Sequence, residues 1–121
     1  MRTTKIVIIF AIEIIDMKIK FDKKYLSELY YEGKCSEKKY RFQPQVVKNY
    51  KKCIDLLENV PRVESLYKYS ALNYEALKGN KTGRESVRVN DQYRIEFSTT
   101  VMESETVVTI CNILELSNHY K

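Results

Sequence analysis

The chain has 121 residues, a length that predicts one compact domain and leaves no room for separate catalytic and regulatory domains. Hydrophobic residues make up 44% of the chain and charged residues 31%, which is enough apolar material for a packed core and excludes disorder as the main state. The net charge of +5 favours a polyanionic partner without identifying one.

The N-terminal run of residues 6–15 is apolar and follows Arg2 and Lys5, as in the hydrophobic region of a signal peptide. No small-residue cleavage site follows this run, Glu13 interrupts it, and it is well short of the roughly 20 residues that span a bilayer. We therefore expect neither export nor membrane insertion. Met17 is a second plausible start, so we interpret residues 1–16 as an N-terminal extension or an extra strand and residues 17–121 as the folded domain.

Two short elements precede the clearest helix of the sequence. Residues 18–21 alternate polar and apolar side chains as a strand does, residues 24–31 are compatible with one or two helical turns, and residues 33–41 are polar and loop-like. Pro44 suits the first turn of a helix, and apolar residues then recur every three or four positions until Pro61 ends the pattern.

Basic residues concentrate between residues 17 and 52, where 11 basic and 4 acidic side chains give a net charge of +7. The segment is either a solvated, lysine-rich face or a surface that contacts nucleic-acid phosphates. Lys48, Lys51 and Lys52 lie on the polar face of the predicted helix and are our candidate RNA-binding lysines.

The second half of the chain predicts a sheet. Residues 62–83 lack periodicity and end in two glycines that flank Lys81, but a Walker phosphate loop places its Lys directly after the second glycine and continues into a helix. Residues 84–90 and 92–98 instead alternate as the two strands of a hairpin. Residues 106–116 form a nearly continuous apolar run, which predicts a central strand covered on both sides.

The hairpin register places two arginines together. The apolar side chains of both strands share one face only if the loop has an odd number of residues, which is simplest as residues 90–92. Arg88 then lies opposite Arg94, where like charges repel unless a bound anion, solvent or pairing with Glu85 and Glu96 relieves them. Removing Arg94 is therefore not expected to lower stability.

The three cysteines include no C-x-x-C pair, and the chain has a single His, so the sequence predicts neither a disulfide framework nor a zinc site. This cysteine usage fits the reducing cytoplasm. Cys53 and Cys111 lie in apolar stretches and are predicted to be small core residues.

Two motifs carry a family resemblance, EALKG at residues 75–79 and SVRVNDQYRI at residues 86–95, together with His119 near the C-terminal end. Over residues 17–121 the chain resembles the HigB-type toxins of the RelE/ParE superfamily. The resemblance implies a small α+β fold, with N-terminal helices packed on one face of an antiparallel sheet. It also implies a ribosome-dependent endoribonuclease that cuts mRNA without metal or other cofactor, and a helix-turn-helix antitoxin as partner.

The resemblance places Lys78, Arg88, Arg94 and His119 in or near the active site. Cutting RNA without metal requires a base for a 2′-hydroxyl, cations for the phosphate and an acid for the 5′-oxygen. We expect both arginines to clamp the phosphate, Lys78 to supply a further cation and His119 to transfer a proton. Two tyrosines are candidates for stacking on an RNA base or assisting the proton, namely Tyr93 and Tyr120.

The chain departs from the family at two places, which leaves the proton-transfer residues open. Some members have a His just before the LKG motif, where this chain has Glu75, a candidate base that could equally cap a helix or form a salt bridge. Some members end in Asp-Tyr-His, whereas this chain ends in SNHYK. Two alternatives therefore remain, a ParE-like toxin that binds gyrase without RNA chemistry and a non-catalytic module that binds RNA or an antitoxin.

Overall fold

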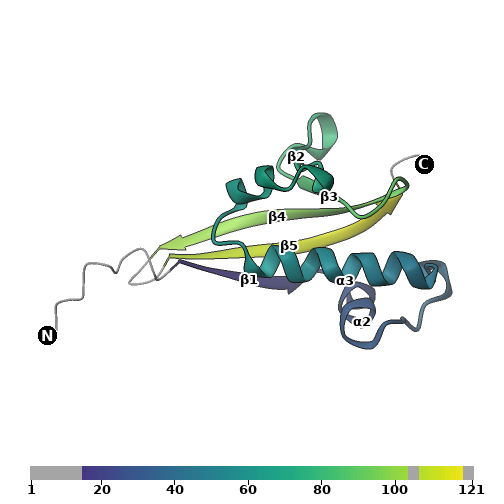
Figure 1. Ribbon diagram of the computed structural model, residues 1–121. Helices are drawn as coiled ribbons and strands as arrows, with labels where there is room; N and C mark the ends of the chain where they lie inside the picture. Colours follow the sequence, from purple (N-terminus) through teal and green to yellow (C-terminus); the bar gives the residue numbers. More distant parts are fainter. Residues whose placement is uncertain (1–14, 104–106, 119–121) are drawn as a thin grey trace, which may run out of the picture.

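The computed structural model describes residues 15–103 and 107–118, which form a five-stranded sheet with two α-helices on one side (Figure 1). The strands lie in the order β1-β5-β4-β3-β2 across the sheet. They are β1 (Ile15–Phe21), β2 (Glu75–Ala76), β3 (Glu85–Arg88), β4 (Tyr93–Glu103) and β5 (Val107–Asn118). This arrangement confirms the predicted α+β fold with N-terminal helices packed on one face of a small sheet.

Both helices follow from the sequence pattern. The longer one, α3 (Pro44–Asn59), begins with a proline whose missing N–H is harmless in the first turn, and it buries Val47, Tyr50, Ile54 and Leu57 as predicted. The shorter one, α2 (Lys24–Glu32), ends at Gly33, whose φ of 78° lies in the left-handed region that glycine adopts readily. The buried Tyr50 hydroxyl donates a hydrogen bond of 2.8 Å to the Leu26 carbonyl and so links the two helices.

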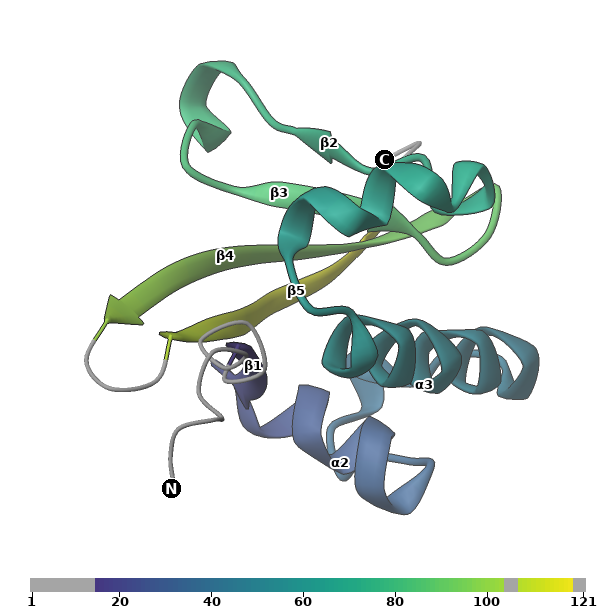
Figure 2. The same cartoon turned by 60° about the vertical axis from the view of Figure 1, so that its left-hand side comes forward.

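The core lies between the helices and one face of the sheet. Figure 2 shows α2 and α3 together on one side, where the 3-10 segments η2 (Val63–Lys68) and η3 (Ser70–Leu72) extend the cover towards β3. Alternate residues of the central strands point into this core and are fully buried, namely Val87, Ile95, Phe97 and Ile113. The other face, which we call the open face, carries the residues in between.

Two details of the sheet differ from the sequence-based expectation. The sheet is mixed rather than wholly antiparallel, because β1 runs parallel to β5. The long run after residue 106 does form the inner strand β5, but the helices cover only one of its faces, and Ile110 and Leu114 stay half-buried. The continuous apolar run therefore predicted burial on both faces of this strand, whereas the structure buries one.

A β-bulge near the end of β5 changes which residues face the helices. Phe97 pairs with Ile113, but its neighbour Glu96 pairs with Glu115, so one extra residue lies in β5. The bulge turns Leu116 into the core and puts Glu115 and Ser117 on the open face. Beside the bulge, the buried Leu116 N–H donates 3.2 Å to the Tyr25 hydroxyl of α2, which fastens this helix to the strand.

The two predicted core cysteines are buried, which confirms their assignment. Burial raises the pKa of Cys53 to about 11 and that of Cys111 to about 12, so both remain neutral thiols at pH 7. At the N-terminal end, β1 begins two residues before Met17. The other residues of the predicted extension, 1–14, lie outside the described residues.

Candidate active site

A polar pocket of about 180 Å³ lies on the open face, where β3, β4 and β5 meet the segment around β2. Two buried charged side chains, Arg94 and Glu96, line it from β4. Burying a charge costs folding free energy unless the charge is paired or hydrogen-bonded, so both side chains require polar partners. The remaining lining residues are Glu75, Leu77, Lys81, Ser86, Ser117 and Asn118.

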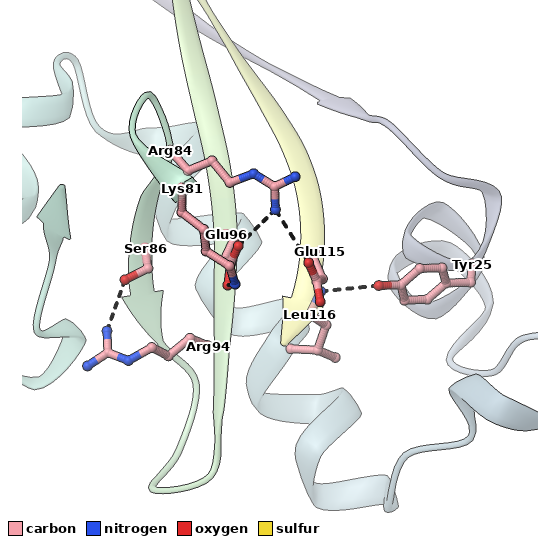
Figure 3. Close-up of polar contacts among 8 residues, drawn as sticks. All are labelled: Tyr25, Lys81, Arg84, Ser86, Arg94, Glu96, Glu115 and Leu116. Atoms are coloured by element: carbon pink, nitrogen blue, oxygen red, sulfur yellow. Dashed lines mark hydrogen bonds and ion pairs between the residues drawn. The ribbon is translucent and has the colours of Figure 1, made fainter. Parts of the chain in front are cut away.

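Glu96 is the most buried carboxylate of the pocket, with 4% of the residue exposed. Its Oε2 accepts a 2.6 Å hydrogen bond from Lys81 Nζ, and its Oε1 accepts one of 2.8 Å from Arg84 Nη1 (Figure 3). Burial opposes ionisation of Glu96, but the hydrogen bonds from Lys81, Arg84 and Ser117 outweigh it and lower the pKa of this carboxyl. Glu96 is therefore an ionised structural anion that holds two cations.

Arg94 is 8% exposed and has a different kind of environment. Its Nη1 donates 3.0 Å to Ser86 Oγ and 3.4 Å to the Asn73 carbonyl, both neutral acceptors. Figure 3 shows it reaching towards Ser86 while Lys81 and Arg84 converge on Glu96. In the described part of the chain Arg94 forms no ion pair, so its positive charge is held in place without being neutralised by a side chain.

The predicted hairpin register is confirmed. Arg88 lies directly opposite Arg94 on the open face, and Val89 N–H donates to the Tyr93 carbonyl, which closes a loop of residues 90–92. The arginines do not pair with Glu85 and Glu96, which was one of the alternatives considered for them. Arg88 instead forms an ion pair with Asp91 in the loop, because register places Glu85 on the helix side and Glu96 is already occupied.

Lys78 and Lys81 belong to one turn but differ in their relation to the pocket. Lys78 is exposed and precedes the 3-10 turn η4 (Gly79–Lys81), whereas Lys81 lines the pocket. β3 follows the turn, as expected for a segment that is not a Walker loop. The turn therefore presents Lys81, rather than the predicted Lys78, to the pocket.

Glu75 lies in β2 directly opposite Ser86 and lines the pocket as an exposed residue. Neither alternative considered for this residue is observed, because it lies in a strand rather than at a helix end and no described residue forms an ion pair with it. Among the described residues the pocket thus has two carboxylates, of which Glu96 is held by cations and Glu75 is not.

The remaining predicted residues lie elsewhere. Lys48, Lys51 and Lys52 line a groove of about 770 Å³ formed by α2, α3 and the segment between them, on the helix side of the sheet. Tyr93 shares the face of Ile95 and packs edge-on against Phe42, with the ring centroids 5.2 Å apart. Two further predicted residues, His119 and Tyr120, lie outside the described residues.

Comparisons with known proteins decide the family. A model of the RelE-like toxin HigB of type II toxin-antitoxin systems matches residues 19–110. The chain belongs to the HigB-like toxin family. No curated protein gave a significant match to the sequence.

Solved structures of two other toxins share the fold of this HigB-like toxin. A YoeB/ParE toxin from Agrobacterium tumefaciens is 17% identical, with a TM-score of 0.50 over 86% of this chain and 100% of that chain. A YafQ mutant from E. coli is 12% identical, with a TM-score of 0.53 over 86% of this chain and 94% of that chain. The low identities limit these two similarities to the fold.

Two further structural observations concern the HigB-like chain. Within residues 15–103 and 107–118, none of the helices is both long and apolar enough to cross a membrane. In the same residues, no three His, Cys, Asp or Glu side chains gather where they could hold a metal ion.

Proposed function

We propose that this HigB-like toxin is a cytoplasmic, ribosome-dependent endoribonuclease that cuts mRNA without a metal ion and thereby inhibits translation. The observation that carries the proposal is Arg94, a buried guanidinium held by neutral acceptors in a polar pocket. An arginine fixed in this way binds a phosphate without first breaking an ion pair. A helix-turn-helix antitoxin is the proposed partner.

The chemistry proposed for the pocket is transesterification of RNA. The 2′-oxygen loses its proton to a base and attacks the adjacent phosphorus, and the bond from phosphorus to the 5′-oxygen breaks. This leaves a 2′,3′-cyclic phosphate on one fragment and, after protonation by an acid, a 5′-hydroxyl on the other. Arg94, which lines the pocket, is assigned to the charge that develops on the phosphate. Arg88, opposite it on the same face, and the exposed Lys78, which precedes the turn, are proposed to add to this stabilisation from outside the pocket lining.

Proton transfer is assigned to His119, which follows the pocket residue Asn118 in the sequence. Glu75 is the second candidate base, and its exposed position in the lining of the pocket supports this role. Glu96 is not a candidate, because both of its oxygens accept hydrogen bonds from cations. Tyr120 and Tyr93 are assigned to stacking on an RNA base, and Lys48, Lys51 and Lys52 to contacts with RNA phosphates on the ribosome.

The deciding experiment is induced expression followed by mapping of mRNA 5′ ends, with Arg94→Ala as the matched control. We expect new 5′-hydroxyl ends inside translated frames, which disappear when ribosomes are kept off the message and are strongly reduced in the control. Intact mRNA together with trapped gyrase-DNA complexes would instead select a ParE-like toxin. Growth arrest with neither new mRNA ends nor gyrase-DNA complexes would instead support the non-catalytic binding module.

A further inference from the structure

The turn between β2 and β3 is built to hold one conformation. Lys81 N–H donates to the Lys78 carbonyl at 3.3 Å, and Thr82 bonds the Gly79 carbonyl through both its N–H and its hydroxyl, the latter at 2.7 Å. Gly83 has a φ of 98°, which a residue with a Cβ adopts only under strain. Because these local bonds fix the backbone, the direction in which Lys81 leaves the turn is also fixed.

Glu96 anchors this turn to the sheet. A single carboxylate, 4% exposed, bonds Lys81 on one oxygen and Arg84 on the other. Glu115 adds a longer contact of 3.4 Å to the same Arg84 guanidinium. Lys81 and Arg84 thus share the carboxylate of Glu96. This contact holds both side chains over the open face, although the side chain of Lys81 is 44% exposed.

The pocket has hydrogen-bond donors that no described residue accepts. An ammonium has three N–H donors, and Lys81 uses one of them on Glu96. Arg94 makes both of its hydrogen bonds through Nη1, so Nη2 and Nε have no partner among the described residues. Both side chains line the same pocket, where these donors are the strong ones suited to an anionic oxygen.

We propose that Lys81 and Arg94 together bind one phosphate of RNA in this pocket, and that Glu96 is a positioning residue that holds Lys81 in place. The identification of the anion as RNA rests on the proposed function. A phosphodiester has two non-bridging oxygens, so an ammonium and a guanidinium on two walls of a pocket can each take one.

A purely structural ion pair is the rival explanation for Lys81 and Glu96. If Lys81 only stabilised the turn, its loss would lower the free energy of unfolding and leave RNA affinity unchanged in the folded protein. If Lys81 binds phosphate, its loss removes one counterion-releasing contact and so weakens the salt dependence of binding as well as the affinity. Affinity and salt slope of the folded protein therefore separate the two explanations.

The experiment uses the full chain and a fluorescent single-stranded RNA analogue in which every 2′-hydroxyl is replaced by hydrogen, so that it binds without being cut. For Lys81→Met we expect affinity to fall about tenfold and the slope of log affinity against log salt to flatten by about 0.7, the value for one single-strand phosphate contact. Lys81→Arg should retain most of the affinity. Lys24→Met, which removes an exposed lysine of α2, is the matched control and should change affinity less than twofold.

Glu96→Gln tests the positioning role separately. It keeps the ammonium but removes the charge that holds it, so we expect a smaller loss of affinity than for Lys81→Met and an unchanged salt slope. Glu115→Gln, which removes only the longer contact to Arg84, should stay near wild type. If Glu96→Gln does not fold, Lys81→Met and Lys81→Arg still decide the phosphate contact.

Cleavage of ribosome-bound mRNA, measured in parallel, separates the inference from the proposed function. Cleavage by the wild type together with full RNA affinity of Lys81→Met would overturn the pocket assignment and leave the nuclease standing. No cleavage by the wild type, with RNA affinity lost in Lys81→Met, would remove the proposed function and leave a phosphate-binding pocket.

Discussion

The two faces of β4 are both buried near the hairpin, but by opposite means. On the helix side, Ile95 and Phe97 have no exposed surface and belong to the hydrophobic core. On the open side, Arg94 and Glu96 are 8% and 4% exposed, and hydrogen bonds to Ser86, Lys81 and Arg84 satisfy them. Alternation along one strand thus separates a layer held by apolar contact from a layer of charged side chains held by hydrogen bonds.

The difference between the faces indicates a difference in role. Apolar burial is the main source of folding free energy, about 25 cal/mol per Å². A buried ion pair contributes little net stability, because the desolvation of both charges offsets their attraction. Its main effect on the open face is to fix where charged groups lie, which is a requirement for binding and catalysis rather than for folding.

The largest expected effect is a loss of stability when a core side chain of the helix-side layer is removed. Phe97→Ala should lower the free energy of unfolding by about 3–5 kcal/mol, because it removes a fully buried ring and leaves a cavity. Urea denaturation at neutral pH measures this loss. Ser98→Ala, the next residue and half-buried on the open face, is the control and should stay within about 0.5 kcal/mol. Equal losses for the two variants would contradict the comparison.

The second effect breaks the open-side layer at its proposed catalytic cation. Arg94→Ala should lower the rate of mRNA cleavage by roughly 10²-fold, comparable to the loss of one preorganised donor to a transition state. Arg94→Lys should recover only part of the rate, since an ammonium cannot reproduce the bidentate guanidinium. Single-turnover cleavage of ribosome-bound mRNA is the measurement, and a wild-type rate in Arg94→Ala would remove this residue from the site.

The sequence predicted the pairing of the arginines but not the burial of one of them. Alternation and loop length sufficed for the register, which placed Arg88 opposite Arg94. The same register puts Ser86 on the face of Arg94, but the other acceptor, the Asn73 carbonyl, lies 21 positions away, and no local pattern indicates it. The structure therefore changes one expectation: Arg94→Ala should cost about 1–3 kcal/mol of stability, because it leaves the buried Ser86 hydroxyl without this donor.

Lys81, Glu96 and Ser117 were missed for similar reasons. The lysine-rich turn was compared only with a Walker loop, and its contact with Glu96 spans 15 residues. Ser117 reaches the open face only because of the β5 bulge, and bulges leave no reliable trace in a single sequence. By contrast, α3 was predictable at both ends because prolines flank it and its apolar residues keep helical spacing.

A third, smaller effect is a difference between the two faces in how stability depends on pH. The pKa of Glu96 is lowered in the folded protein, so its ionised form stabilises the fold above the unfolded value of 4.5, and this contribution is lost as pH falls through the folded value. We expect wild type to exceed Glu96→Gln in stability by about 1–2 kcal/mol at pH 7, with the gap closing as pH falls below 4.5. Urea midpoints across this range measure the gap, and a constant gap would contradict the linkage. Phe97→Ala, which removes no ionisable group, should show a gap to wild type that does not close.

The smallest effect on stability is expected on the lysine face of α3, where neither apolar packing nor buried pairing holds the side chains. Lys48, Lys51 and Lys52 are exposed, so reversing all three to Glu should change the free energy of unfolding by less than about 1 kcal/mol in total. If all three contact RNA phosphates, the same variant should flatten the salt dependence of ribosome association by about 2 in log-log slope, since each single-strand contact contributes about 0.7. Pelleting with ribosomes from 50 to 200 mM salt gives the slope. An unchanged slope would place the ribosome-binding surface elsewhere and leave the open face as the site of RNA contact.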